Sequence, residues 1–379
     1  MSLTEKNLSI GVHGQEEMSV GVYNMLSSFT KGLHDSLRKK LENSAYVHEF
    51  QKNNSLPLIS VGFNIIGHKG WDFILEQGGI NIMWNVDSTF YKNFPLIKKH
   101  HKNPNFYMIS LSEDDNEAIK KFLPELNSFC MPLAIDPGTW YSDNTEKTRD
   151  VVFLASIHED ETETIAQAKK DLPENFFKLF LLLYEYSLEH PYKNFWEIFN
   201  YFARQFNFPV ENTDLYAYMF NKIAYTSSYR KRIDLVKKLS DFNLEVYGMG
   251  PWEKHISGRV KYMGEANCQE AIKIIKEAKI AINLQPMQMR NGIHDRIMNA
   301  SAANTMVFTD KNKQISRSYG ESVCYMDSVD FCGIEDSIDY YLKNEDERVL
   351  KAKRAQEITM ANHTWDNRVE KLLSILVVN

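Results

Sequence analysis

The segment 282–304 contains the residues of this chain that are best suited to bind an anion. An apolar stretch of strand length leads through a polar loop into a helix that is expected to begin near Gly292. The free N–H groups and the positive dipole end at the start of a helix form a natural anion site. Arg290, His294 and Arg296 lie there and add donors suited to a diphosphate, because a guanidinium is a planar fork of donors. A surface helix with solvated charges is the alternative, but the succession of strand, loop and basic helix start favours a ligand site.

Three other loops follow apolar runs and contain small or polar residues. Ser156 comes directly after one run, Gly248 ends a second, and Gly264 with Glu265 closes a third. In doubly wound sheets, ligands bind outside the carboxyl ends of the strands. Glycine lets a backbone approach a ligand closely, although a plain tight turn explains Gly248 equally well. We therefore expect these four residues to line the same ligand site.

Candidate general bases lie in the first half of the chain. His13 follows the first apolar run and titrates in a useful pH range, and Glu16 could orient a hydroxyl group beside it. Asp87 ends another apolar run and is a second candidate base. For His13 and Glu16 the alternative is a turn with solvated side chains, and for Asp87 it is a carboxylate that caps its loop.

These residues can be positioned only if strands and helices alternate along the chain. Short apolar runs do alternate with helical patterns, and Gly, Asn, Asp or Pro residues separate them. Such alternation predicts parallel sheets covered by helices on both faces. The expected strands are 8–13, 58–63, 80–86, 106–111 and 128–135 in the first half, and 151–155, 244–247, 260–263, 280–284 and 305–309 in the second.

The length of 379 residues favours two domains. Asp136-Pro137-Gly138 and the polar stretch 141–150 are typical of a linker, which predicts domains at 1–148 and 149–379. Residues 161–227 are rich in aromatic residues, helical in pattern and without a strand candidate, so we interpret them as a helical insertion in the second domain. A last amphipathic helix is expected at about 366–377, with Thr364 as its cap.

Composition narrows the class of protein. Hydrophobic residues make up 43% of the chain and the formal net charge is −6, which favours a globular protein that does not bind nucleic acid. The four cysteines are scattered, so neither a zinc site nor a set of disulfides is indicated. The polar N-terminus is not a secretory signal, and we expect a cytoplasmic protein. The basic runs Lys98–Lys102 and Tyr229–Arg232 are interpreted as solvated faces, with contact to phosphate or an anionic surface as the minor alternative. The first of them leaves peripheral contact with the inner membrane surface open.

The run Asn291–Asn299, continued by Asn304–Asp310, resembles the donor-site segment of the CgeB-type (spore-protein) glycosyltransferase-like family, which belongs to the GT-B group. That segment has an arginine, an acidic residue three positions on, and small residues before an apolar strand. Six other stretches are similar to the same family, namely 150–154, 246–248, 260–264 and 363–368, and in the first half 82–87 and 131–136.

The resemblance implies a GT-B fold, in which two Rossmann-like domains face a cleft. It implies a glycosyltransferase that works without a metal or cofactor and takes a nucleotide sugar, UDP- or GDP-linked, on its C-terminal domain. The acceptor, a glycan, a lipid-linked glycan or a protein, would bind the N-terminal domain, where His13, Glu16 and Asp87 are the candidate bases. The donor-binding residues implied are Ser156, Gly248, Gly264, Glu265, Arg290, Asn291, Gly292, His294, Asp295, Arg296 and Asn299.

Two positions depart from the family pattern. Retaining GT-B enzymes often carry glutamates at the positions of Asn291 and Asn299, whereas the glycine that ends the helix is replaced conservatively by Asn304. An active enzyme with a retaining outcome is the favoured hypothesis. A sugar-nucleotide epimerase on the same scaffold and a non-catalytic sugar-nucleotide-binding protein remain alternatives, and the two asparagines support the latter. The helical insertion is compatible with a homodimer, although its aromatic residues are more typical of a packed core.

Overall fold

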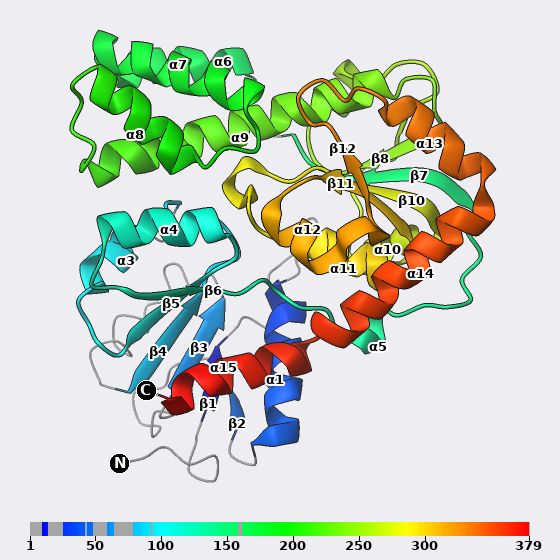
Figure 1. Cartoon of the computed structure of the whole chain (residues 1–379), viewed down its shortest axis with the longest axis horizontal. Helices are drawn as coiled ribbons and strands as arrows, with labels where there is room; N and C mark the ends of the chain where they lie inside the picture. Colours follow the sequence, from blue (N-terminus) through cyan, green and yellow to red (C-terminus); the bar gives the residue numbers. More distant parts are fainter. Residues whose placement is uncertain are drawn as a thin grey trace. The chain divides into compact units, whose positions relative to one another are not determined.

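The computed structural model describes residues 10–13, 26–41, 44–47, 59–63, 79–91, 94–157 and 161–378. The chain forms two compact units, one of residues 1–139 together with 360–379 and one of residues 140–359. Each unit is built on a six-stranded parallel sheet with helices packed against it (Figure 1). The expected α/β fold with two Rossmann-like domains is therefore confirmed.

The sheet of the first unit has the strand order β2-β1-β3-β4-β5-β6. Its inner strands are apolar because helices cover a parallel sheet on both faces, and every residue of Ile59–Phe63 is buried. The strand Ser44–Val47 has too little apolar character to stand out in the sequence and was not expected. The elements are β1 (Ile10–His13), α1 (Leu26–Lys40), β2 (Ser44–Val47), β3 (Ile59–Phe63), β4 (Ile80–Trp84), α3 (Phe94–His100), β5 (Phe106–Ser110), α4 (Glu113–Phe122), β6 (Asn127–Cys130) and α5 (Pro137–Trp140).

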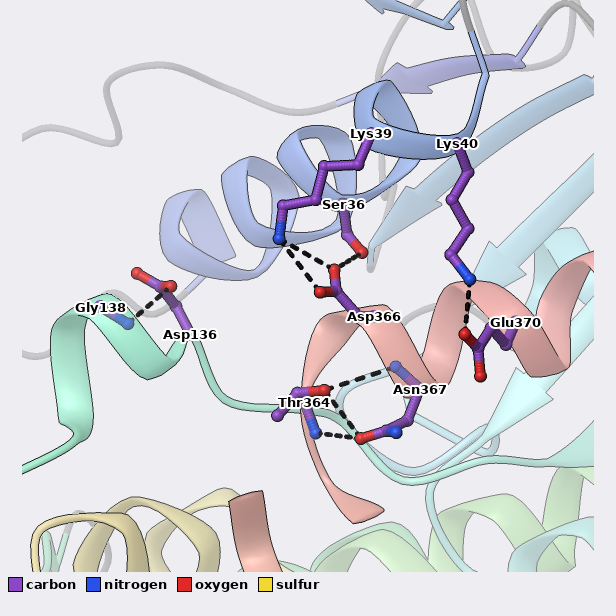
Figure 2. Close-up of polar contacts among 9 residues, drawn as sticks. All are labelled: Ser36, Lys39, Lys40, Asp136, Gly138, Thr364, Asp366, Asn367 and Glu370. Carbon is purple, nitrogen blue, oxygen red and sulfur yellow. Dashed lines mark hydrogen bonds and ion pairs between the residues drawn. The ribbon is translucent and has the colours of Figure 1, made fainter. Parts of the chain in front are cut away.

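The last helix, α15 (Trp365–Val378), packs against α1 in this first unit. The two helices approach closely at Gly32, where an added Cβ would lie 2.3 Å from the Trp365 ring. Figure 2 shows Asp366 between two partners on α1, accepting from Ser36 Oγ and pairing with Lys39 Nζ at 3.1 Å. The predicted cap is confirmed, because Thr364 Oγ1 accepts from the main-chain N–H of the third helical residue at 3.4 Å.

A buried arginine fastens the start of α15 to the segment after β6. Arg368 Nε donates to the carbonyl oxygens of Pro132 at 2.8 Å and Leu133 at 3.0 Å, and its Nη1 donates to Asn362 O at 2.9 Å. Its Nη2 lies 2.9 Å from His363 Nδ1, and burial lowers the pKa of His363 to about 3, so the neutral ring accepts this bond. The segment 363–368 thus holds the chain end on the first unit. The boundaries of the two units differ from the expected 1–148 and 149–379. The reason is that α15 buries its apolar face against α1 rather than against its neighbours in sequence.

The sheet of the second unit has the strand order β12-β11-β10-β7-β8-β9. Alternate residues of β7 and β10 fill its core, including Val151, Phe153, Ile280 and Ile282. The elements are β7 (Arg149–Leu154), β8 (Leu244–Tyr247), β9 (Lys261–Tyr262), α10 (Cys268–Glu277), β10 (Ala278–Asn283), α11 (Asp295–Ala302), β11 (Met306–Asp310), α12 (Lys313–Tyr319), β12 (Cys324–Met326), α13 (Ile334–Lys343) and α14 (Glu345–Asn362). As predicted, Asn304 has the left-handed backbone, with φ 53°, after the end of α11.

Between β7 and β8 lie the helices α6 (Glu161–Asp171), α7 (Glu174–Glu189), α8 (Phe195–Gln205) and α9 (Thr213–Lys238). We call α6, α7, α8 and the first half of α9 the helical insertion. Buried aromatic rings hold it together, for example Phe199 against Tyr216 at 5.1 Å between centroids. Helix α9 is continuous over 26 residues, and it therefore runs past residue 227, where the insertion is expected to end. Among the described residues, no helix is long and apolar enough to cross a membrane.

Candidate functional site

The topology of the second unit creates a crevice between β7 and β10. The chain leaves β7 toward β8 and β9, and then crosses back to β10, β11 and β12 on the other side of β7. This is the order of a dinucleotide-binding sheet, in which ligands lie at the carboxyl ends of the two strands where the order reverses. All strand pairs are parallel, so the loops after β7, β8, β9 and β10 leave the sheet at the same edge. The predicted donor residues of all four loops therefore lie at one edge.

The loops after β7 and β8 run against one another. Ser156 Oγ accepts from the main-chain N–H that follows Gly248, at 3.0 Å. A Cβ on Gly248 would lie 2.2 Å from Ala155 O, and one on Gly250 would lie 1.7 Å from Ile157 O. Both glycines have positive φ, at 144° and 107°. Their small size therefore serves the close approach of two segments of this chain, which is a sufficient reason for glycine without any ligand.

Two arginines reach this edge of the sheet, Arg232 through Ser156 O and Arg296 beside Leu154 and Asn283 at the ends of β7 and β10. Arg232 is on α9 and Arg296 is in the first turn of α11. Arg232 Nη1 donates to Ser156 O at 2.5 Å, and its pKa is lowered to about 10 by burial and then by the nearby charge of Arg296. The Nε of Arg296 is buried and has no hydrogen-bond partner among the described residues. Two close guanidiniums and an unused buried donor are the arrangement that an anion would stabilise.

The start of α11 is built by its own side chains. His294 is the cap residue, and its Nδ1 lies 3.2 Å from Arg296 N and 2.7 Å from Asp295 Oδ1. Burial lowers the pKa of His294, although the carboxylate of Asp295 opposes this shift. Burial opposes ionisation of Asp295 as well, but His294 and Arg296 outweigh it and lower the pKa of that carboxyl. Asp295 also accepts from Asn299 Nδ2 at 3.3 Å, so it partly balances the two arginines. The helix begins at Asp295, three residues later than expected.

The residues just before this helix are turned into the protein. Arg290 is only 7% exposed and donates to the carbonyl oxygens of Lys193 and, at 3.2 Å, Ser187 in the helical insertion. Asn291 Oδ1 accepts from Lys313 N at 3.3 Å, at the start of α12. These contacts give Arg290 and Asn291 a part in holding the loop, and their contact with a donor stays a prediction.

A glutamine holds the same loop from the sheet side. Gln285 Nε2 donates to Met289 O at 3.1 Å and to Gly292 O at 2.8 Å. Asn312 Nδ2 donates to the same oxygen of Gly292 at 2.9 Å, and Gln285 N donates to the carboxylate of Asp310. The loop from β10 to α11 is therefore preorganised before any ligand binds, which lowers the entropy cost of binding.

The remaining predicted residues are at strand ends. Gly264 has φ 84° and its carbonyl oxygen accepts from Gly248 N at 3.0 Å, while Glu265 beside it is exposed. In the first unit, His13 is the last residue of β1 and Asp87 follows β4, half-buried. Both strands pair with β3, so these two residues lie at the same sheet edge. Glu16 lies outside the described residues.

Arg232 and Gln285 are two residues of this site that were not expected from the sequence. The run Tyr229–Arg232 was interpreted as a solvated face, with contact to phosphate as the minor alternative. Arg232 lies three residues before Leu235 and four before Val236, which are both buried on α9. This helical spacing places Arg232 on the side of the helix that faces the sheet, and it could have indicated the role of this residue. No sequence pattern indicates the role of Gln285, because its hydrogen-bond partners are carbonyl oxygens of the loop that it stabilises.

The chain shares its architecture with known glycosyltransferases over nearly its whole length. Sucrose-phosphate synthase from Thermosynechococcus elongatus has 9% sequence identity and a TM-score of 0.55, with 98% of this chain and 100% of that chain covered. The DNA-modifying enzyme β-glucosyltransferase has 11% identity and a TM-score of 0.52, again with 98% and 100% covered. At such identities the shared property is the fold, and that fold is GT-B, as expected.

Residues 230–374 match the family described as "Glycosyl transferase-like". The matched segment includes both Arg232 and Arg296 and extends into α15. No curated protein matches this chain by sequence. Residues 230–374 are therefore similar to this family and lie on a GT-B fold, which confirms the expected class of glycosyltransferase. The narrower resemblance to the CgeB-type family stays a prediction.

Proposed function

We propose that this protein transfers a sugar from a nucleotide-sugar donor, and that Arg232 and Arg296 bind the diphosphate of the donor. The observation that carries this proposal is the pair of close guanidiniums at the carboxyl ends of β7 and β10, with Arg296 Nε buried and unused. A diphosphate relieves the repulsion between the two side chains and accepts from that donor. As the sugar leaves, negative charge builds up on the diphosphate, and two fixed guanidiniums stabilise it more in the transition state than in the ground state.

Other residues of the edge would bind the rest of the donor. The exposed carboxylate of Glu265, at the end of β9, is suited to accept from the hydroxyls of a ribose in a UDP- or GDP-linked sugar. Gly264 leaves open space beside it, since nothing lies within 4 Å of an added Cβ. Asn299 is 1% exposed and bonded to Asp295, so we assign it to the support of the helix start.

The acceptor hydroxyl needs a base, and the proposal takes it from the first unit. His13 and Asp87 lie at the carboxyl edge of that sheet, and Glu16 completes the set of candidates. Since the charge on the leaving group is met by arginines, the mechanism proposed needs no metal. A glycan, a lipid-linked glycan or a protein is the proposed acceptor.

Calorimetric titration of the full chain with UDP, GDP and their hexose conjugates tests the donor site. We expect one nucleotide to bind, and Arg296→Gln and Arg232→Gln each to weaken it at least about tenfold, as for a lost hydrogen bond to a charged group. Arg259→Gln is the matched control, because Arg259 is an exposed arginine of the same unit that bonds Asn243 Oδ1 at 2.9 Å. Equal affinity for all four proteins would refute the assignment of the two arginines.

A second candidate function is binding without transfer. Retaining enzymes carry glutamates where this chain has Asn291 and Asn299, and both asparagines are used in bonds within the protein. Turnover separates the two functions. A protein that binds a sugar nucleotide tightly but releases no nucleoside diphosphate with a panel of glycan acceptors supports the second.

A further inference from the structure

A small pocket with both polar and apolar lining residues opens between the sheet and the helical insertion of the second unit. We call it the insertion pocket. It lies at the carboxyl ends of β10, β11 and β12, next to the loop that Gln285 and Arg290 hold. Its volume of about 40 Å³ gives room for about three water molecules. Its lining includes Ser187, Lys231 and Asp310.

Two polar atoms of this lining have no partner. Asp310 is 6% exposed, its Oδ2 accepts from Gln285 N, and the Ser328 hydroxyl lies beside the carboxyl and lowers its pKa, while Oδ1 makes no hydrogen bond of good geometry to a described residue. Ser187 is 2% exposed, and its hydroxyl likewise has no partner among the described residues. Buried polar groups are nearly always satisfied in folded proteins, so two unsatisfied groups that line one pocket call for a ligand or water.

The chemistry of the pocket selects for hydroxyl groups. Burial raises the pKa of Asp310 to about 7, so this carboxyl is available both ionised and protonated near neutral pH. A hydroxyl group satisfies either form, because it both donates and accepts, whereas a phosphate cannot donate to a carboxylate. Lys231 Nζ donates to Val329 O at 3.0 Å and keeps two further N–H groups that a hydroxyl oxygen could accept. A volume of about 40 Å³ admits one edge of a hexose with its hydroxyl groups but not the whole ring.

We propose that the insertion pocket receives the hydroxyl-bearing edge of the donor's sugar, so that Asp310 and Ser187 contribute to the choice of sugar. The proposal rests on the proposed function, since it adds a sugar subsite to the nucleotide site. It gives the helical insertion a role in the reaction, because Ser187 comes from α7. It predicts that the gain in affinity from nucleoside diphosphate to nucleotide sugar depends on this pocket.

Calorimetry with matched ligand pairs tests the proposal on the full chain. UDP with UDP-glucose, UDP with UDP-N-acetylglucosamine, and GDP with GDP-mannose are titrated, and the pair with the tightest wild-type binding is kept. Ser187→Ala and Asp310→Asn are then compared with Ser301→Ala. Ser301 is the matched control because it is a fully buried serine of the same unit whose hydroxyl also lacks a partner, but it does not line the pocket.

We expect both pocket variants to bind the nucleoside diphosphate within about twofold of wild type and the nucleotide sugar about three- to tenfold more weakly, as for one lost hydrogen bond. Ser301→Ala should change neither. Ser187→Ala removes only an unpaired hydroxyl, so it keeps the test valid if Asp310→Asn unfolds, which circular dichroism would show. Equal affinity of wild type for both members of every pair, or an unchanged ratio in Ser187→Ala, overturns the sugar subsite while leaving the nucleotide site standing. Absence of binding by any of these nucleotides overturns the proposed function itself.

Discussion

The buried histidine at the start of α15 makes a sharp prediction about acid stability. His363 is 5% exposed and its pKa is lowered to about 3 by burial and by the charge of Arg368. In the unfolded chain the same group has a pKa of about 6.5. Below about pH 6.5, His363 binds a proton in the unfolded state but not in the folded state. Stability is therefore lost as the pH falls from about 6.5 toward about 3, and it is fully present above that window.

The size of the effect follows from the two pKa values. Integrated from about pH 8 to about pH 5, the difference in proton binding removes about 2 kcal/mol from the free energy of unfolding. Asp115 acts in the opposite direction, because burial raises its pKa to about 6 and acid favours its protonated folded form. The pH dependence of the wild type alone is thus a sum, and a variant is needed to isolate His363.

His363→Gln supplies that comparison. The glutamine amide oxygen can still accept from Arg368 Nη2, but it does not titrate. Urea unfolding is measured at about pH 8 and at about pH 5 by tryptophan fluorescence, and hydrogen exchange is measured at residues 360–368. On acidification, the free energy of unfolding of the variant should fall by about 2 kcal/mol less than that of wild type. If wild type and variant lose the same free energy, His363 is not buried as a neutral acceptor and the reasoning fails.

Four further substitutions test the second unit. Gly250→Ala puts a Cβ 1.7 Å from a main-chain oxygen at φ 107°, and it should lower the free energy of unfolding by about 3 kcal/mol or more. Gly264→Ala is the control, because its Cβ, at φ 84°, would lie in open space and should cost about 1 kcal/mol. Equal losses for the two variants in urea unfolding would contradict the close approach at Gly250. Lys147→Met removes three hydrogen bonds, at 2.8, 3.1 and 2.8 Å, to the ends of α10 and α11 and to the threonine hydroxyl before β11. It should lower the free energy of unfolding by about 2 kcal/mol, and an unchanged midpoint of urea unfolding would refute this. Arg290→Lys loses the guanidinium that donates to two carbonyl oxygens of the insertion, so hydrogen exchange should become faster in α7 and α8 while that of β10 stays constant. The same change in exchange rate in all three elements would argue against this role.

The sequence alone determined the alternation of strands and helices. Strand-length apolar runs such as 151–155 and 280–284 recur between helical patterns, and that periodicity reflects burial on a parallel sheet. It also determined local features that depend on neighbouring residues, including Thr364 as a cap and Asn304 as a left-handed residue after α11. Short strands with little apolar character escaped it, as β2 and β12 did, because partners far along the chain stabilise them.

The tertiary structure decided which side chains meet. Periodicity could not place α15 on α1, because that packing depends on the match between Gly32 and Trp365, 333 residues apart. It could not show that Arg290 is occupied by carbonyl oxygens of the insertion while Arg232, assigned to a solvated face, lies beside Arg296. Residue types report what a group can do, whereas burial and partners decide what it does, and both are set by contacts between segments that are distant in sequence.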